Sequence, residues 1–122
     1  SKNFNSLNIT EKHHSKKQDA PSGTAIDLAN SLSSDLNSHK KDGEFYQSNV
    51  INNKNIHSLR GDDYLAEQVV DFISEHESFK LEHKVHDRRA YLYGVQIVLD
   101  LFHELNGFNF GLENIIAEKI NI

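Results

Sequence analysis

The chain contains no cysteine, which excludes disulfides, thiolate metal sites and cysteine nucleophiles and is compatible with a reducing cytoplasm. It has no apolar run near the roughly 18 residues that a membrane-spanning helix needs, and its start does not resemble a signal peptide. The six glycines are scattered, so the chain has no glycine-rich nucleotide-binding fingerprint. We therefore expect a cytoplasmic protein whose chemistry uses neither a thiol nor a dinucleotide bound by this stretch of chain.

What is present is a short, acidic chain. Its 122 residues are enough for one domain with a modest core. Its net charge of -5 argues against nucleic acid as the main partner. The sequence has no internal repeat and no low-complexity segment, so we treat residues 1–122 as a single domain.

The spacing of apolar residues predicts alternating strands and helices. The expected elements are a strand within 4–13, a helix from 25 to about 36, a long loop over 37–55, strands over 56–61, 64–73 and 79–85, a helix from Tyr91 to Leu105, and a short helix over 112–120. This order is typical of an α+β domain in which helices pack on one face of a mixed sheet.

The segment EKHHSKKQDAPSGTA, residues 11–25, gathers positive charge just before a helix start. Free N–H groups and the helix dipole already favour an anion at such a position. Ser22 and Thr24 add hydroxyl groups, Gly23 allows a ligand to approach the backbone closely, and Lys17 lies in the preceding loop. These groups together suit a carboxylate or a phosphate. The alternative interpretation is that Ser22 or Thr24 only caps the helix.

The adjacent histidines His13 and His14 titrate near neutral pH, so either can move a proton or, when protonated, bind an anion. If the strand extends to them, their side chains point to opposite sides and do not share one ligand. They could also be solvated residues at a strand end. A zinc hydrolase that uses His13, His14, His83 and His86 is a further alternative, but the chain has no H-E-x-x-H motif and we expect no metal site.

The same segment closely resembles the signature E-x-H-H-x-x-K-x-D-A-P-S-G-T-A of the 4-hydroxy-tetrahydrodipicolinate reductase (dihydrodipicolinate reductase) family. Two later segments resemble family patterns in the same order. They are SLRGDDYLAEQVVDF, through Arg60, Asp63, Glu67, Val69 and Phe72, and EHKVHDRRAYLYG, through His83, Lys84, Arg88, Tyr91 and Gly94. Ala66-Glu67-Gln68 departs from the family's usual Gly-Glu-His.

The resemblance covers nearly the whole chain but corresponds only to the C-terminal half of the family. It implies that residues 1–122 are a substrate-binding and tetramerisation domain with a four-stranded mixed sheet. It also implies a cofactor, NADH or NADPH, bound mainly by an N-terminal Rossmann domain that has no counterpart in this chain. The implied activity is hydride transfer to a cyclic dicarboxylate in diaminopimelate and lysine biosynthesis, by a homotetramer assembled through its sheets.

The resemblance also implies roles for individual side chains. Lys17 is the favoured proton donor, and His13 helps to polarise or protonate the substrate. The residues that would hold substrate carboxylates are His14, Lys17, Ser22, Gly23, Thr24 and Arg88. Arg88 could instead form a structural salt bridge, and Lys16 receives no role. A non-catalytic oligomerisation or anion-binding domain is the alternative function.

Overall fold

The computed structural model describes residues 4–33, 37–38, 47–104, 107 and 113–120, and it divides the chain into two compact units, Ser1–His86 and Asp87–Ile122. Within the described residues, every helix is too short or too polar to cross a membrane.

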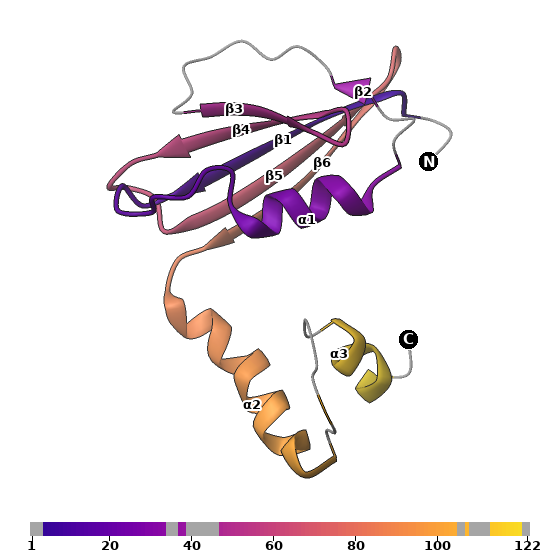
Figure 1. The fold of residues 1–122 in the computed structure, drawn as a ribbon. Coiled ribbons are helices and arrows are strands. Elements are labelled where there is room, and N and C mark those ends of the chain that lie inside the picture. Colours follow the sequence, from indigo (N-terminus) through magenta and orange to yellow (C-terminus); the bar gives the residue numbers. More distant parts are fainter. Residues whose placement is uncertain (1–3, 34–36, 39–46, 105–106, 108–112, 121–122) are drawn as a thin grey trace. The chain divides into compact units, whose positions relative to one another are not determined.

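A mixed sheet with one helix forms the first unit (Figure 1). Its elements are β1 (Ser6–His13), α1 (Gly23–Ser31), β2 (Asn37–Ser38), β3 (Gln47–Ile51), β4 (Lys54–Arg60), β5 (Ala66–Ile73) and β6 (Ser78–Val85). The strand order is β3-β4-β1-β5-β6, and the short β2 also pairs with β1. Strand β1 runs parallel to β4 and antiparallel to β5. The predicted α+β class is therefore confirmed.

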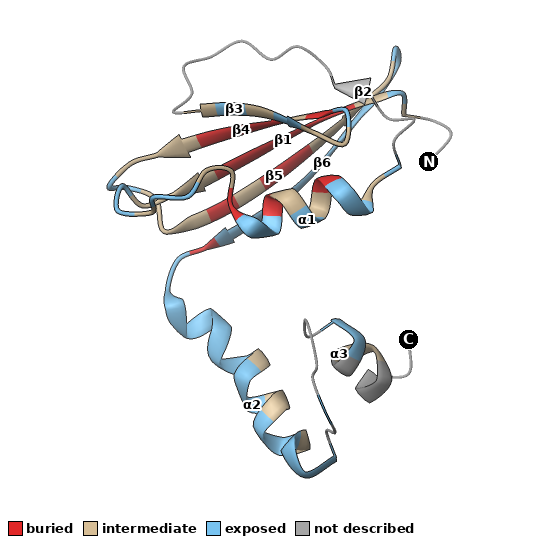
Figure 2. Ribbon diagram, in the orientation of Figure 1, coloured by how far each residue is buried: buried red, intermediate tan, exposed pale blue. Residues whose placement is uncertain are grey.

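The core of this unit lies between α1 and one face of the sheet (Figure 2). In register, Ile9 on β1 lies between Ile56 on β4 and Val70 on β5. Because side chains alternate along a strand, Leu7 points to the same face as Ile9. The small side chains of α1 let the helix lie close to this apolar patch. The buried cluster is Leu7, Ile9, Ala25, Ala29, Ile56 and Val70.

The predicted loop over 37–55 is wrong at β2, at β3 and at the start of β4, and its residues 39–46 lie outside the described residues. The expected number of four strands is too low. Strands β3 and β4 form an antiparallel hairpin. Its turn is Asn52-Asn53, with φ of 49° and 62°, and asparagine is among the few residues that accept the positive φ of a tight hairpin turn. The region reads as a loop because β3, QSNVI, is mostly polar and lies at the edge of the sheet.

Helix α1 ends at Ser31, earlier than the predicted end near Leu36, which lies outside the described residues. Leu32 already has an extended backbone, with φ of -87° and ψ of 150°. The side-chain amide of Asn52 donates to the carbonyl oxygens of Ala29, at 3.0 Å, and Leu32, at 3.1 Å. The hairpin turn therefore satisfies carbonyl groups that the end of the helix leaves without helical partners.

The second unit is helical. It contains the 3₁₀ turn η1 (Arg88–Tyr91), α2 (Leu92–Leu101), the 3₁₀ turn η2 (Phe102–Glu104) and α3 (Glu113–Ile120). The helix predicted from Tyr91 to Leu105 is confirmed as α2 with a tighter turn at each end, although Leu105 itself lies outside the described residues. The short helix predicted near the C-terminus is confirmed as α3.

Candidate functional site

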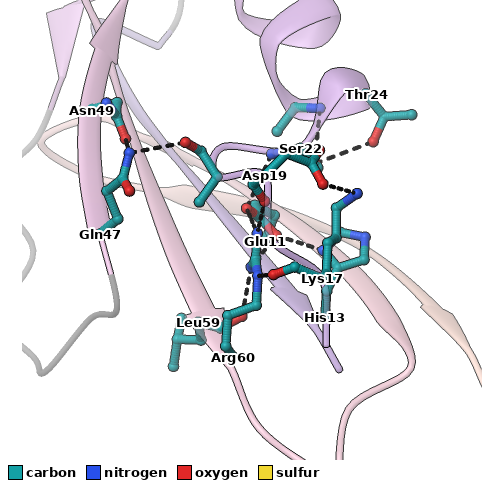
Figure 3. A network of polar contacts seen from close by, with 12 residues as sticks. Glu11, His13, Lys17, Asp19, Ser22, Thr24, Gln47, Asn49, Leu59 and Arg60 are labelled. Atoms are coloured by element: carbon teal, nitrogen blue, oxygen red, sulfur yellow. Dashed lines mark hydrogen bonds and ion pairs between the residues drawn. The ribbon is translucent and has the colours of Figure 1, made fainter. Parts of the chain in front are cut away.

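A fully buried carboxylate, that of Glu11, lies at the centre of the candidate site (Figure 3). Glu11 lies two residues after Ile9 and four after Leu7 on β1, so its side chain points to the same face of the sheet, the face that α1 covers. Arg60, at the end of β4, donates from Nη1 to Oε2 at 2.9 Å and from Nη2 to Oε1 at 3.0 Å. This two-pronged pairing compensates the cost of removing the carboxylate from water.

Glu11 also binds the two parts of the motif that flank the loop. Its Oε2 lies 2.6 Å from Nδ1 of His13, two residues along the same strand. Its Oε1 accepts a hydrogen bond from the backbone N–H of Ser22, at 3.1 Å. One carboxylate therefore connects the end of β1, the end of β4 and the start of α1.

The Glu11 carboxylate is ionised at neutral pH. Burial by itself would raise the pKa of Glu11, but hydrogen bonds from Arg60 and His13 and the positive charge of Arg60 outweigh it and hold the pKa below its ordinary value. A negative charge is thus fixed inside the fold, and the Arg60 guanidinium balances it.

Arg60 also holds the loop between β1 and α1. Its Nη2 donates to the carbonyl oxygen of Asp19 at 2.6 Å, and its Nε donates to that of Lys17 at 3.3 Å. Further along the loop, the amide of Gln47 on β3 donates to the carbonyl oxygen of Ala20 at 2.8 Å. The loop that carries the basic residues is therefore fastened to the sheet through its own backbone.

Lys17 lies at the surface of this network. Its Nζ is 2.8 Å from Oδ1 of Asp19, and its side chain is partly exposed. The hydrogen bond from Lys17 holds the pKa of the exposed Asp19 carboxyl below its ordinary value. Among the described residues, Asp19 is thus an acidic partner of this ammonium group, which carries three N–H donors in all.

The start of α1 has the geometry of a capped helix. Ser22 is the N-cap, and its Oγ accepts from the backbone N–H of Ala25 at 3.4 Å. Its Oγ also lies 3.4 Å from the hydroxyl of Thr24. Gly23 and Thr24 are exposed, and a Cβ on Gly23 would meet no atom within 4 Å. Capping by Ser22 is confirmed, whereas anion binding at this helix start stays a prediction.

The structure places His13, Lys17 and Ser22 next to the pair of Glu11 and Arg60. The His13 side chain contacts Glu11, whereas Ser22 contacts Glu11 and Lys17 contacts Arg60 through backbone atoms. His14 follows the strand directly, is half-buried, and accepts a hydrogen bond at its carbonyl oxygen from the backbone N–H of Lys17 at 3.1 Å.

Arg88 is not part of this network as described. It begins η1 in the second unit, where it is exposed, and the two units are not placed relative to each other. Its assignment to the basic pocket therefore stays a prediction.

Glu11 and Arg60 are the residues whose function sequence reasoning missed, although both match the family patterns. A signal for Glu11 was present, because it continues the inward alternation of Leu7 and Ile9 and a carboxylate at a core position needs a cationic partner. Arg60 lies 49 residues away, and no spacing rule identifies it as that partner.

The zinc alternative finds no support in the part of the chain that the structure describes, since no three His, Cys, Asp or Glu side chains gather there in a metal-binding group. His13 points into the covered face of the sheet at the end of β1. His83 lies on β6, with β5 between the two strands. His13 and His83 therefore lie on strands that are not adjacent in the sheet.

Comparison with known proteins agrees with the resemblance of the motif. The family described as "Dihydrodipicolinate reductase, C-terminus" matches residues 1–116. A solved structure, the dipicolinate-bound dihydrodipicolinate reductase from Paenisporosarcina sp. TG-14, is 32% identical with a TM-score of 0.71. The match covers 92% of this chain and 45% of that one.

Two curated relatives carry the name 4-hydroxy-tetrahydrodipicolinate reductase. The protein from Bacillus velezensis is 31% identical, over 93% of this chain and 45% of the relative. The protein from Coxiella burnetii is 35% identical, over 93% of this chain and 48% of the relative. The chain therefore spans about half the length of the curated relatives that it matches.

Proposed function

We propose, from the premise that the chain belongs to the family of dihydrodipicolinate reductase C-terminal domains, that it is the substrate-binding part of a 4-hydroxy-tetrahydrodipicolinate reductase. The complete enzyme reduces 4-hydroxy-tetrahydrodipicolinate to tetrahydrodipicolinate in diaminopimelate and lysine biosynthesis, in the cytoplasm. NADH or NADPH, bound mainly by an N-terminal Rossmann domain, supplies the hydride when present.

One observation carries this proposal: Glu11 and Arg60 hold the strand end with His13 and the loop with Lys17 against the capped start of α1. The solved relative that shares this fold is described as dipicolinate-bound. A cyclic dicarboxylate presents two negative groups, and the gathered cations, free N–H groups and hydroxyls suit them.

Each side chain of the site has a role that follows from its chemistry. Ser22, Gly23 and Thr24 bind one carboxylate at the helix start, and His14 binds carboxylate oxygen as well. Lys17 contributes to the same binding and gives a proton to the substrate, with assistance from His13. An acid is needed because addition of hydride to a conjugated imine builds negative charge, which a positioned proton donor neutralises. Arg88 adds positive charge to the pocket.

Assembly into a homotetramer through the sheet belongs to the same proposal. The outer strand β6 leaves Phe79 half exposed and Leu81 slightly more than half exposed. Apolar area of this kind is typical of a surface that a second subunit covers.

The binding step is testable by calorimetry with pyridine-2,6-dicarboxylate on the complete protein. We expect binding that weakens as salt rises, because the contacts are between charges. Lys17→Ala should weaken binding, whereas Lys16→Ala, which removes a neighbouring exposed charge, should not. Absence of binding at millimolar ligand would refute the substrate site.

The alternative function, a non-catalytic oligomerisation or anion-binding domain, is separated from the reductase by turnover. A reductase consumes NADH or NADPH only when 4-hydroxy-tetrahydrodipicolinate is present, and pyridine-2,6-dicarboxylate inhibits it. A protein that binds the dicarboxylate but shows no such oxidation would support the anion-binding alternative.

A further inference from the structure

We propose that Glu11 is a positioning residue that fixes His13 as the tautomer protonated at Nδ1, so that Nε2 is the nitrogen that exchanges protons in the site. The tautomer follows from the network alone. Its use in proton transfer rests on the proposed function.

The direction of the hydrogen bond follows from the charge of Glu11. An ionised carboxylate has no proton to donate, and the Glu11 carboxylate is ionised because Arg60 grips both of its oxygens. Nδ1 of His13 lies 2.6 Å from Oε2. The proton of this short contact therefore belongs to Nδ1, and in the neutral ring Nε2 carries a lone pair.

The carboxylate is held too firmly to turn away from His13. Arg60 binds both oxygens, the backbone N–H of Ser22 binds Oε1, and the side chain has no exposed surface. Rotation of the carboxylate would break at least two of these bonds in a place that water does not reach. The His13 ring therefore meets a fixed acceptor, and its plane and tautomer are set before any ligand arrives.

This arrangement suits a group that gains and loses one proton. When Nε2 takes up a proton, the ring becomes an imidazolium whose positive charge lies next to the negative charge of Glu11. When Nε2 gives that proton to the substrate atom on which charge develops, the ring returns to the neutral Nδ1–H form. Glu11 stays ionised throughout, so each cycle moves one proton and leaves the network unchanged.

Nitrogen NMR of the complete protein, labelled with ¹⁵N-histidine, reads this tautomer directly. Above the pH at which the rings are neutral, His13 should show a protonated, pyrrole-type Nδ1 and an unprotonated, pyridine-type Nε2. His13→Gln identifies the signals. Glu11→Gln should move His13 toward the Nε2–H form, because an amide can donate its own N–H to Nδ1.

Glu67→Gln is the matched control. Glu67 is also a buried carboxylate, and it accepts from Lys12 at 3.5 Å and Lys84 at 3.2 Å. It pairs in register with Lys12, so it lies on the sheet face opposite to Glu11. Its loss should leave the His13 tautomer as it is.

The outcomes separate this inference from the proposed function. An Nε2–H tautomer of His13 in the unsubstituted protein overturns it, and so does an equal change in the Glu67→Gln protein. If Glu11→Gln does not fold, the spectrum of the unsubstituted protein alone decides. In an active reductase, Glu11→Gln should lower kcat by roughly 10²-fold with a smaller change in KM. If the unsubstituted protein does not bind the dicarboxylate, the proposed function is refuted, but the assignment of the His13 tautomer is unaffected.

Discussion

Replacing Arg60 with methionine removes the guanidinium group that binds both oxygens of the buried Glu11 carboxylate. Methionine keeps most of the volume of the arginine stem, so the change mainly removes charge and donors. Glu11 then stays buried with a negative charge that neighbours such as His13 and the Ser22 N–H compensate in part.

The magnitude follows from the burial of both partners. The side chain of Arg60 is 6% exposed and that of Glu11 is 0% exposed, so solvent does not screen the pair. Removing one partner of such a buried pair typically costs about 3–5 kcal/mol. A natural domain has roughly 5–15 kcal/mol of unfolding free energy in total. We therefore expect Arg60→Met to lose a large share of the stability of the first unit.

Urea unfolding followed by circular dichroism measures this loss. With a denaturant slope of about 1–3 kcal/mol/M, a loss of about 3–5 kcal/mol should lower the midpoint by roughly 1–5 M. Lys80→Met is the control, because Lys80 is 64% exposed and its nitrogen lies 3.6 Å from Asp71 on the neighbouring strand. That exposed pair should be worth only about 0–1 kcal/mol.

The pH dependence distinguishes loss of charge from loss of packing. In the unsubstituted protein the pKa of Glu11 is lowered, so its stabilisation is present above the ordinary glutamate value and is lost as pH falls through the folded value. In Arg60→Met, burial is largely unopposed and raises the pKa of Glu11, so stability falls as pH rises above the ordinary value. The difference between the two proteins should therefore be largest near pH 7 and should shrink below about pH 4.

Two results would refute this reasoning. One is a loss no larger than that of Lys80→Met, which would mean that the buried carboxylate does not depend on Arg60. The other is a large loss that does not vary between pH 3 and pH 7, which would assign the effect to packing. Glu11→Gln combined with Arg60→Met should recover part of the stability, since it removes the unpaired charge.

If Lys17 donates a proton, Lys17→Ala in the complete enzyme should lower kcat by about 10²–10⁴-fold with a smaller rise in KM. Steady-state kinetics measure both parameters, with Lys16→Ala as the control. An unchanged kcat at saturating substrate would exclude the donor role. Ser22→Ala should cost about 0.5–2 kcal/mol of unfolding free energy, because the cap on the N–H of Ala25 is lost, and a loss below that range in urea would contradict the cap. Light scattering of the complete protein should give the mass of a tetramer, and a strict monomer at high concentration would argue against assembly.

Part of the fold could be predicted from local sequence signals. In β6 the apolar residues Phe79, Leu81 and Val85 lie on one face, β1 alternates at Leu7 and Ile9, and the cap at Ser22 marks the start of α1. Strands β4 and β5 do not alternate strictly, but their apolar residues cluster in short runs bounded by turn residues. Strand β3 has two apolar residues in five and gains its place from hydrogen bonds with β4. Pairing of this kind depends on a neighbour that local sequence does not identify.

The candidate site could be predicted only in part. The motif identified His13, Lys17 and the helix start, because they are close together in sequence. Glu11 and Arg60 are 49 residues apart in the chain, and they meet because their strands, β1 and β4, are adjacent in the sheet. Strands β4 and β5 also do not pair with each other, since β1 lies between them, and this order places Arg60 beside the motif.

The central position of β1 means that the parts of the site on this strand and the parts on the loop move on different timescales. This strand carries Glu11 and His13 and is hydrogen-bonded to β4 on one side and β5 on the other. Its amide hydrogens exchange with solvent only when the sheet itself opens, whereas loop segments open locally and far more often. The strand therefore holds His13 in place for as long as the domain is folded. The side chain of Lys17 is partly exposed on a loop whose backbone is fastened to the sheet, so it can change rotamer many times within that period while the backbone stays in place.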